Sequence, residues 1–144
     1  MQVKQIMQQK VAIADPNMTI RDVARKMRAG NIGCLPVGEN DRLIGMVTDR
    51  DIAVRAVADG RAPGNTSVRD VMSGGVGYCF EDDDAEAAAQ IMAKHQVRRL
   101  PVLNHDKRLV GVIALADLGR SEARSAQGAL QGVSEPTDKE RRHI

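Results

Sequence analysis

The sequence predicts a mixed fold of helices and strands, α/β (α+β), built from two tandem copies of one β-α-β-β-α unit. Three observations predict it: an internal repeat, one amphipathic helical stretch per copy, and a pair of apolar strands joined by a polar turn in each copy. With 144 residues, 42% hydrophobic and 28% charged, the chain falls in the range of globular proteins. It is long enough to bury a core as one domain or two small units.

The repeat is visible when the sequence is laid over itself with a shift of 65 residues, which aligns residues 35–37 with residues 100–102, both Leu-Pro-Val. After one inserted residue, Gly45 falls on Gly111 and Asp51 on Asp117. The earlier matches place Val3, Met7, Val11, Ala24 and Met27 on Val68, Met72, Val76, Ala89 and Met92. A period this long indicates a duplicated module and not a solenoid array.

The repeat sets the expected domain limits. We expect the first domain at residues 3–59, a linker with Gly and Pro at 60–67, and the second domain at 68–120. Residues 121–144 form a polar tail. Its first part is expected to extend the last helix, and disorder is expected from Gly132 onward.

Each copy is expected to contain a short helical piece, an extended segment, an amphipathic helix, two strands and a closing helix. In copy one these are residues 3–7, 11–14, 19–29, 34–37, 43–48 and 49–58. In copy two they are residues 68–72, 76–80, an Ala-rich helix after residue 84, 97–103, 109–114, and a helix from 115. The two strands of each copy are joined by polar turns, as in a hairpin.

The amphipathic helices follow from apolar spacing. In copy one, Ile20, Val23, Ala24 and Met27 recur at i, i+3, i+4 and i+7, and in copy two Ala85, Ala88, Ala89 and Met92 do the same. Thr19 with Asp22 fits a capping box at the start of the first helix. Gly30 fits a stop at its end.

Composition excludes several functions. Tyr78 and Phe80 are the two aromatic residues, so the chain lacks the stacking platforms that bind single-stranded nucleic acid. A formal charge of +2 is small for a protein that neutralises many phosphates. The longest apolar run, 109–116, is far shorter than the roughly 20 residues of a membrane helix. With no apolar leader at the N-terminus, we expect a cytoplasmic protein that binds neither nucleic acid nor membrane.

The sharpest motif is residues 45–51, Gly-Met-Val-Thr-Asp-Arg-Asp, where a strand is expected to end and a helix to begin. Gly45 permits close approach of another backbone. The carboxylate of Asp51 can accept two hydrogen bonds from a vicinal diol such as a ribose, and the Thr48 hydroxyl can donate to an oxygen of a ligand. The same residues also fit a capping box that needs no ligand. Both interpretations stay open, and they are compatible for Thr48.

These repeats resemble CBS domains, on the residues LPVGENDRLIGMVTDRDI at 35–52 and RRLPVLNHDKRLVGVIALADL at 98–118. The resemblance covers roughly residues 3–118. It implies a CBS pair, or Bateman module, whose two copies pack with pseudo-two-fold symmetry and commonly form a homodimer. Many such pairs bind AMP, ADP, ATP or related adenosyl ligands in clefts between the copies, and they act as regulators and not as catalysts.

The resemblance also implies site residues. The first site would comprise Thr48, Asp51, Met46 as an apolar wall, backbone of Gly77 and Tyr78, and Arg98 from copy two. The second site would comprise Asp117, Val112 as an apolar wall, Arg99 toward phosphate, and backbone of Ala12 and Ile13. Ala114 departs from the family pattern because it replaces the hydroxyl residue of the second copy. The two sites are therefore expected to be unequal.

Other residues suggest weaker alternatives. The acidic run 81–84 precedes a helix and fits compensation of the helix dipole, with a divalent-cation site as the other interpretation. His95 and His105 are expected at the surface, and Cys34 and Cys79 as structural thiols. We therefore expect no metal site and no obligatory cofactor. The leading function is a non-enzymatic regulatory module with an adenine nucleotide as its ligand; the alternative is an interaction protein that docks on an unknown partner without nucleotide.

Overall fold

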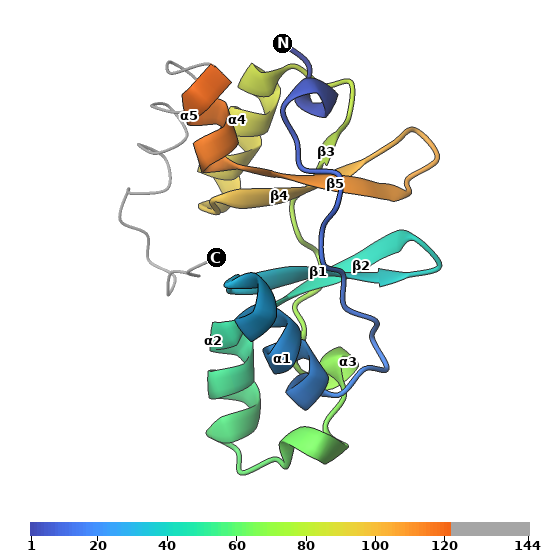
Figure 1. Ribbon diagram of the computed structural model, residues 1–144, viewed down its shortest axis with the longest axis vertical. Coiled ribbons are helices and arrows are strands. Elements are labelled where there is room, and N and C mark those ends of the chain that lie inside the picture. Colours follow the sequence, from blue (N-terminus) through green and yellow to red (C-terminus); the bar gives the residue numbers. More distant parts are fainter. Residues whose placement is uncertain (122–144) are drawn as a thin grey trace. The chain divides into compact units, whose positions relative to one another are not determined.

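The computed structural model describes residues 1–121 and confirms the α+β fold (Figure 1). The expected extension of the last helix into the tail and the expected disorder from Gly132 onward concern residues 122–144, which lie outside the described residues. In chain order the main elements are α1 (Ile20–Gly30), β1 (Cys34–Glu39), β2 (Arg42–Thr48), α2 (Asp49–Ile52), α3 (Val68–Val71), β3 (Cys79–Phe80), α4 (Ala85–His95), β4 (Arg99–Leu103), β5 (Leu109–Ala114) and α5 (Leu115–Ser121). Each copy thus has the predicted helix, hairpin and closing helix.

The chain divides into two compact units that do not coincide with the sequence repeats. The β1–β2 unit comprises Ala12–Val76, and the β3–β5 unit comprises Met1–Val11 together with the described residues from Gly77 to Ser121. The leading segment of each repeat therefore packs with the other repeat's hairpin. The limits expected at 3–59 and 68–120 are those of the sequence repeats. The compact units follow the packing, so their boundaries are different.

Backbone hydrogen bonds and apolar burial hold both exchanged segments. The amide of Val3 donates to Asp83 O at 2.9 Å, and its side chain is fully buried in the core of the β3–β5 unit. In the other unit, the amide of Val68, at the start of α3, donates to Met18 O at 2.8 Å, and Val68 and Val71 are buried in that core. The two segments are equivalent in the repeat, and each buries a valine in the core of the unit that it joins.

In the β1–β2 unit, β1 and β2 form an antiparallel hairpin with Leu35 opposite Val47. The predicted strand at 11–14 is reduced to a single bridge between Ala14 and Val37. The start of α1 is as predicted, because the Thr19 side chain accepts a hydrogen bond from the Asp22 amide at 3.2 Å. Its predicted stop is wrong by one residue: Gly30 is still helical, and Asn31 takes the left-handed conformation that ends the helix.

The closing helix of the first copy is less regular than predicted. It begins as α2 and continues as a π-helical stretch over Ala53–Val57. In the β3–β5 unit, β3 lies parallel to β4, which pairs antiparallel with β5. Both cores are aliphatic, as the composition requires. No helix in the described part of the chain is both long and apolar enough to cross a membrane.

Candidate functional site

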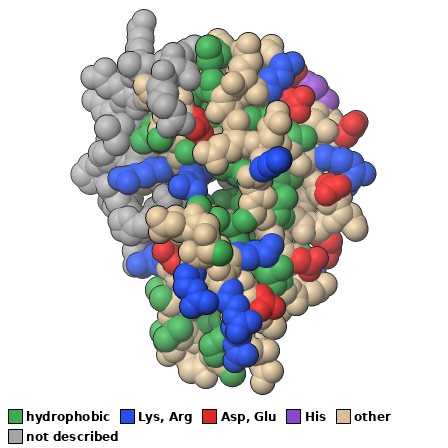
Figure 2. Space-filling view, in the orientation of Figure 1, with side chains coloured by type: hydrophobic (Ala, Val, Ile, Leu, Met, Phe, Trp, Pro, Cys, Tyr) green, Lys and Arg blue, Asp and Glu red, His purple; other side chains and the backbone are tan. Residues whose placement is uncertain are grey.

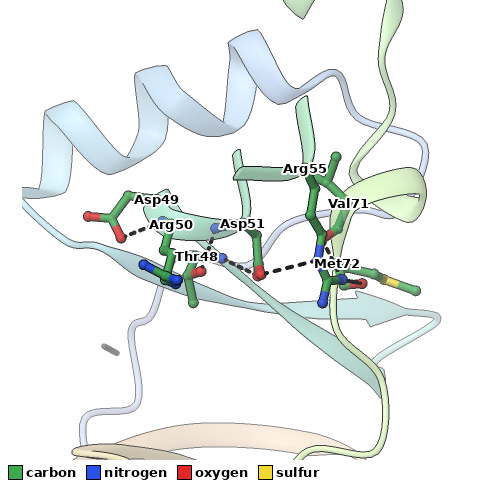
Figure 3. A network of polar contacts seen from close by, with 7 residues as sticks. All are labelled: Thr48, Asp49, Arg50, Asp51, Arg55, Val71 and Met72. Carbon is green, nitrogen blue, oxygen red and sulfur yellow. Dashed lines mark hydrogen bonds and ion pairs between the residues drawn. The ribbon is translucent and has the colours of Figure 1, made fainter. Parts of the chain in front are cut away.

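Thr48 and Asp51 lie where β2 ends and α2 begins, and they bond to each other (Figure 3). The Asp51 amide donates to Thr48 Oγ1 at 2.9 Å, and the Thr48 amide donates to Asp51 Oδ2 at 3.0 Å. This reciprocal pair is a capping box, which satisfies two amides at the helix start. The structural interpretation of the motif is therefore realised, and it uses one carboxylate oxygen of Asp51.

The other oxygen of Asp51 faces a residue that the sequence analysis missed. Arg55 Nε lies 3.9 Å from Asp51 Oδ1, and Arg55 also donates to the backbone oxygens of Val71 at 3.3 Å and Met72 at 3.1 Å (Figure 3). The spacing of Asp51 and Arg55, i and i+4 on one helical stretch, could have indicated this ion pair. Arg55 lies in the π-helical stretch that continues α2, and it thereby connects this stretch to the end of α3.

The second copy keeps half of the same arrangement. The Ala114 amide donates to Asp117 Oδ2 at 2.8 Å, although residue 114 has no hydroxyl with which to complete the box. Asp117 is buried, with 3% of its surface exposed, whereas the Asp51 side chain is 14% exposed. Both carboxylates are thus fixed at the third residue of a helix that follows directly on a hairpin.

Gly45 and Gly111 permit the expected close approach, and the approaching backbone is the chain itself. A Cβ at Gly45 would lie 2.6 Å from Ser73 O, and one at Gly111 would lie 2.7 Å from Gln8 O. The neighbouring residues are the predicted apolar walls. Met46 exchanges two backbone hydrogen bonds of 2.9 Å with Ser73, and Val112 exchanges bonds of 2.9 and 3.0 Å with Gln8. The chain directly after each exchanged segment therefore lies beside a predicted site: Ser73 lies against β2 in one unit, and Gln8 lies against β5 in the other.

The two arginines differ in position. Arg98 precedes β4 and is exposed, and its carbonyl accepts a hydrogen bond from the Leu115 amide at 2.8 Å. Arg99 is half-buried in β4 and lies directly opposite Ala114 in the hairpin register. Opposite residues in an antiparallel pair have their Cβ atoms about 5 Å apart. Arg99 is therefore the cation next to the position where the hydroxyl is missing.

The remaining site residues divide between the units. Ala12 and Ile13 belong to the β1–β2 unit with Met46, Thr48 and Asp51; Gly77 and Tyr78 belong to the β3–β5 unit with Arg98, Arg99, Val112 and Asp117. The carbonyl of Ile13 already accepts a hydrogen bond from Lys26 Nζ at 3.1 Å. Tyr78 is 38% exposed and packs edge-to-face on Phe80, with ring centroids 5.7 Å apart. Each unit thus carries one half of the predicted contact set for each site.

The acidic run is not an isolated dipole cap, because it bonds to a histidine. His105 in the β4–β5 turn hydrogen-bonds to Asp82 and stacks on Phe80, with ring centroids 5.6 Å apart. This hydrogen bond lowers the pKa of Asp82 and raises the pKa of His105. His105 is exposed, as expected, but it has a partner 23 residues away in sequence. Asp84 is the N-cap residue of α4, in agreement with the dipole interpretation.

Neither metal binding nor a reactive thiol finds support among residues 1–121. No three His, Cys, Asp or Glu side chains there are placed to hold a metal ion. Cys34 and Cys79 are both buried. Burial, followed by the nearby charge of Asp83, raises the pKa of Cys79 to about 12. Its thiolate, the nucleophilic form, is therefore scarce at neutral pH.

Known proteins share the sequence pattern of both repeats. The family model for the CBS domain matches residues 3–57 and 68–121. The CBS domain-containing protein YhcV of Bacillus subtilis is 43% identical over 134 residues, which are 92% of this chain and 94% of that protein. The crystal structure of Hypoxic Response Protein I, with two coordinated zinc ions, is 34% identical with a TM-score of 0.77 and covers 84% of this chain and 98% of that chain.

A further solved structure bears on ligands. The CBS domain pair of protein MJ0100, in complex with 5′-methylthioadenosine and S-adenosyl-L-methionine, is 27% identical with a TM-score of 0.72. The match covers 83% of this chain and 94% of that chain. That pair therefore has the same fold as residues described here and holds adenosyl compounds.

Proposed function

The chain belongs to the CBS domain family, with two CBS domains in tandem, and from this we propose that it is a regulatory module that binds an adenine nucleotide or adenosyl compound. The observation that carries the proposal is the repeated carboxylate. Asp51 and Asp117 occupy the same place after each hairpin, and each is held by a backbone amide. A carboxylate fixed in this way can accept hydrogen bonds from a ribose diol without losing further rotamer freedom.

The other contacts follow the chemistry of such a ligand. Met46 and Val112 supply aliphatic walls for adenine, with backbone of Gly77 and Tyr78 on the first site. Arg99 supplies a guanidinium for phosphate at the second site, which matches the planar, bidentate geometry that guanidinium offers. Arg98 has the corresponding role at the first site, and Ala12 and Ile13 contribute backbone to the second. The adenosyl ligands of MJ0100 support this ligand class.

The two sites should differ in the ligand that they prefer. At the first site a ribose must share Asp51 with Arg55, which lies 3.9 Å from the free oxygen. At the second site Ala114 offers no hydroxyl, but Arg99 stands opposite it. We therefore assign phosphorylated ligands such as AMP, ADP or ATP to the second site. No catalytic role is part of the proposal, and the protein is taken to act as a homodimer in the cytoplasm.

Isothermal titration calorimetry with AMP, ADP, ATP, 5′-methylthioadenosine and S-adenosylmethionine tests the proposal. We expect at least one to bind with a Kd below 1 mM, and Asp117→Asn or Asp51→Asn to weaken binding at its own site about tenfold or more. Asn is the matched substitution because its amide oxygen still accepts the hydrogen bond of the cap. Arg99→Gln should weaken AMP more than adenosine.

The second candidate function is an interaction protein whose CBS pair needs no nucleotide. One observation favours it: Asp51 is already paired within the chain, through the capping box and Arg55. If all five compounds fail to bind at millimolar concentration while the chain still captures a partner, this candidate replaces the first. Light scattering at tens of micromolar tests the dimer separately, since a monomer mass of 15.6 kDa contradicts it.

A further inference from the structure

Both aromatic residues of the chain and one histidine form a ladder of rings in the β3–β5 unit. Tyr78 packs edge-to-face on Phe80, with ring centroids 5.7 Å apart, and His105 stacks on Phe80 at 5.6 Å with the ring planes 10° apart. His105 also hydrogen-bonds to Asp82. Figure 2 shows a histidine at the surface of this unit, beside acidic side chains. A series of contacts therefore joins an exposed carboxylate to Tyr78, which the proposed function places at the first site.

The ladder joins two turns that are each shaped by their own hydrogen bonds. In the β4–β5 turn, the Asn104 side chain accepts bonds of 3.0 Å from two amides of the same turn. In the turn between β3 and α4, the carboxylate of Asp83 accepts a bond of 2.9 Å from the Phe80 amide. His105 and Asp82 then join one turn to the other. A change in this contact therefore acts on the β4–β5 turn as a whole.

The surroundings of His105 are mainly acidic. Charged groups around the His105–Asp82 pair come from the turn before α4, from the N-terminal segment and from the β4–β5 turn itself: Glu81, Asp82, Asp83, Lys4, Asp106 and Lys107. The hydrogen bond to Asp82 raises the pKa of His105, and the charges of the three carboxylates before α4 act in the same direction. Since histidine is the side chain that titrates near physiological pH, the contact is sensitive to small changes of pH.

Protonation strengthens both contacts that His105 makes. The imidazolium forms an ion pair with Asp82, and on Phe80 it gains the attraction that a cation has for the face of an aromatic ring. A neutral ring keeps the stacking contact and a weaker hydrogen bond. The two side chains are 73% and 41% exposed, so water screens the charges and the gain is modest. A modest gain can be reversed by pH alone.

We propose that protonation of His105 regulates ligand binding at the first site through Phe80 and Tyr78. With the charged ring in place, Phe80 is held between His105 and Tyr78, and Tyr78 is fixed where its backbone meets the ligand. With the neutral ring, the β4–β5 turn is held less firmly and Tyr78 loses that support. Ligand therefore binds more tightly at acidic pH, and bound ligand in return favours the protonated ring. The inference rests on the proposed function for its ligand, but the ladder can be tested without one.

Tyrosine fluorescence of the free protein tests the ladder, because Tyr78 is the one tyrosine of a chain that has no tryptophan. The signal therefore reports the surroundings of Tyr78 alone. We expect its intensity to change between about pH 5.5 and about pH 8.5, with the midpoint at which His105 titrates in NMR. Asp82→Asn should lower that midpoint, and His105→Gln should abolish the transition.

Two further variants show which side chains carry the signal. Phe80→Leu should leave the NMR titration of His105 in place and remove the response of Tyr78, since the ring between them is lost. His95→Gln is the matched control, because His95 is the other exposed histidine in residues 1–121 and a Cβ at Gly77 would lie 2.7 Å from its ring. This variant should keep the transition. Circular dichroism establishes that each variant folds.

Calorimetry with 5′-methylthioadenosine extends the test to the ligand, because this compound has no phosphate to titrate in the same range. It is performed on an Asp117→Asn chain, in which the second site is weakened. We expect a Kd about threefold lower at about pH 5.5 than at about pH 8.5, a small factor because His105 acts through other side chains. In the same chain with His105→Gln, the two values should be equal.

Four results would overturn the proposal. Tyr78 fluorescence that is constant with pH, or that changes equally in His105→Gln, removes the ladder. A transition that is lost in His95→Gln and kept in His105→Gln assigns the signal to the other histidine. Equal affinity at both pH values removes the regulation while the proposed function stands. Absence of binding at millimolar concentration removes the proposed function at the first site and the regulation with it, although the Tyr78 transition would still report the ladder.

Discussion

Replacing Gly45 by Ala should destabilise the β1–β2 unit strongly, because the added Cβ meets backbone. It would lie 2.6 Å from Ser73 O. Ordinary contacts between carbon and carbonyl oxygen begin at about 3.3 Å, so β2 and the segment at Ser73 must separate by about 0.7 Å. Met46 and Ser73 exchange two hydrogen bonds of 2.9 Å at this point, and a separation of that size weakens both.

The expected loss follows from these two terms. Overpacking costs about 1–3 kcal/mol, and two weakened backbone hydrogen bonds add about 1 kcal/mol in total. We therefore expect the free energy of unfolding to fall by about 2–4 kcal/mol, which corresponds to a Tm lower by roughly 5–12 °C for a chain of this size. Gly111→Ala should behave similarly, since its Cβ would lie 2.7 Å from Gln8 O.

Urea unfolding followed by circular dichroism measures this loss, with Gly74→Ala as the matched control. Gly74 is next to Ser73, and the nearest atom to a Cβ there is Ile44 O at 4.0 Å. The control should stay within about 0.5 kcal/mol of the parent chain. If Gly45→Ala also stays within that range, the close contact of β2 with the exchanged segment does not exist in solution, and the assignment of compact units fails with it.

Three further predictions concern single side chains. His105 should titrate in NMR with a pKa above 6.5, returning toward that value in Asp82→Asn; because its folded pKa is raised, its contribution to stability is complete below pH 6.5 and lost as pH rises through the folded pKa. An unchanged titration in Asp82→Asn would refute the pair. Cys79 should resist alkylation at pH 8 in the folded chain, because burial raises its pKa to about 12, and peptide mapping after iodoacetamide would reveal a contrary result. Ser73→Ala should leave stability unchanged or raise it by up to about 1 kcal/mol, since the buried Ser73 hydroxyl has no hydrogen-bond partner; a loss above 1 kcal/mol in thermal unfolding would mean that it has one.

Local patterns predicted most of the elements, because they depend on neighbours in sequence. The period of Ile20, Val23 and Met27 requires a helix with one buried face, and those three side chains are buried. The equivalent positions of Asp51 and Asp117, each at the third residue of the helix after a hairpin, follow in the same way from the sequence repeat. The helix end at Asn31 was missed by one residue, because both Gly and Asn tolerate the left-handed conformation.

The exchange of the leading segments could not be predicted, since it depends on a choice between two similar cores. Val3 and Val68 are equivalent in the repeat, and an apolar residue does not encode which of two aliphatic cores will bury it. The contact of His105 with Asp82 was missed for a related reason: the two residues lie in different turns, and only the pairing of β3 with β4 brings those turns together.

The position of Arg55 relates the proposed ligand to the packing of α3. Its ion pair with Asp51 is long, at 3.9 Å, and the Arg55 side chain is 45% exposed, so the pair contributes little and a ribose that bonds to Asp51 can displace it. The same guanidinium donates to Val71 O and Met72 O, directly before the segment that closes on Gly45. Occupation of Asp51 would therefore change a side chain that connects the π-helical stretch after α2 to the end of α3. Under the proposed function, Arg55→Met should strengthen ligand binding at the first site while it weakens the contact of the π-helical stretch with α3. If Arg55→Met changes neither the ligand affinity at the first site nor the free energy of unfolding, this coupling is refuted.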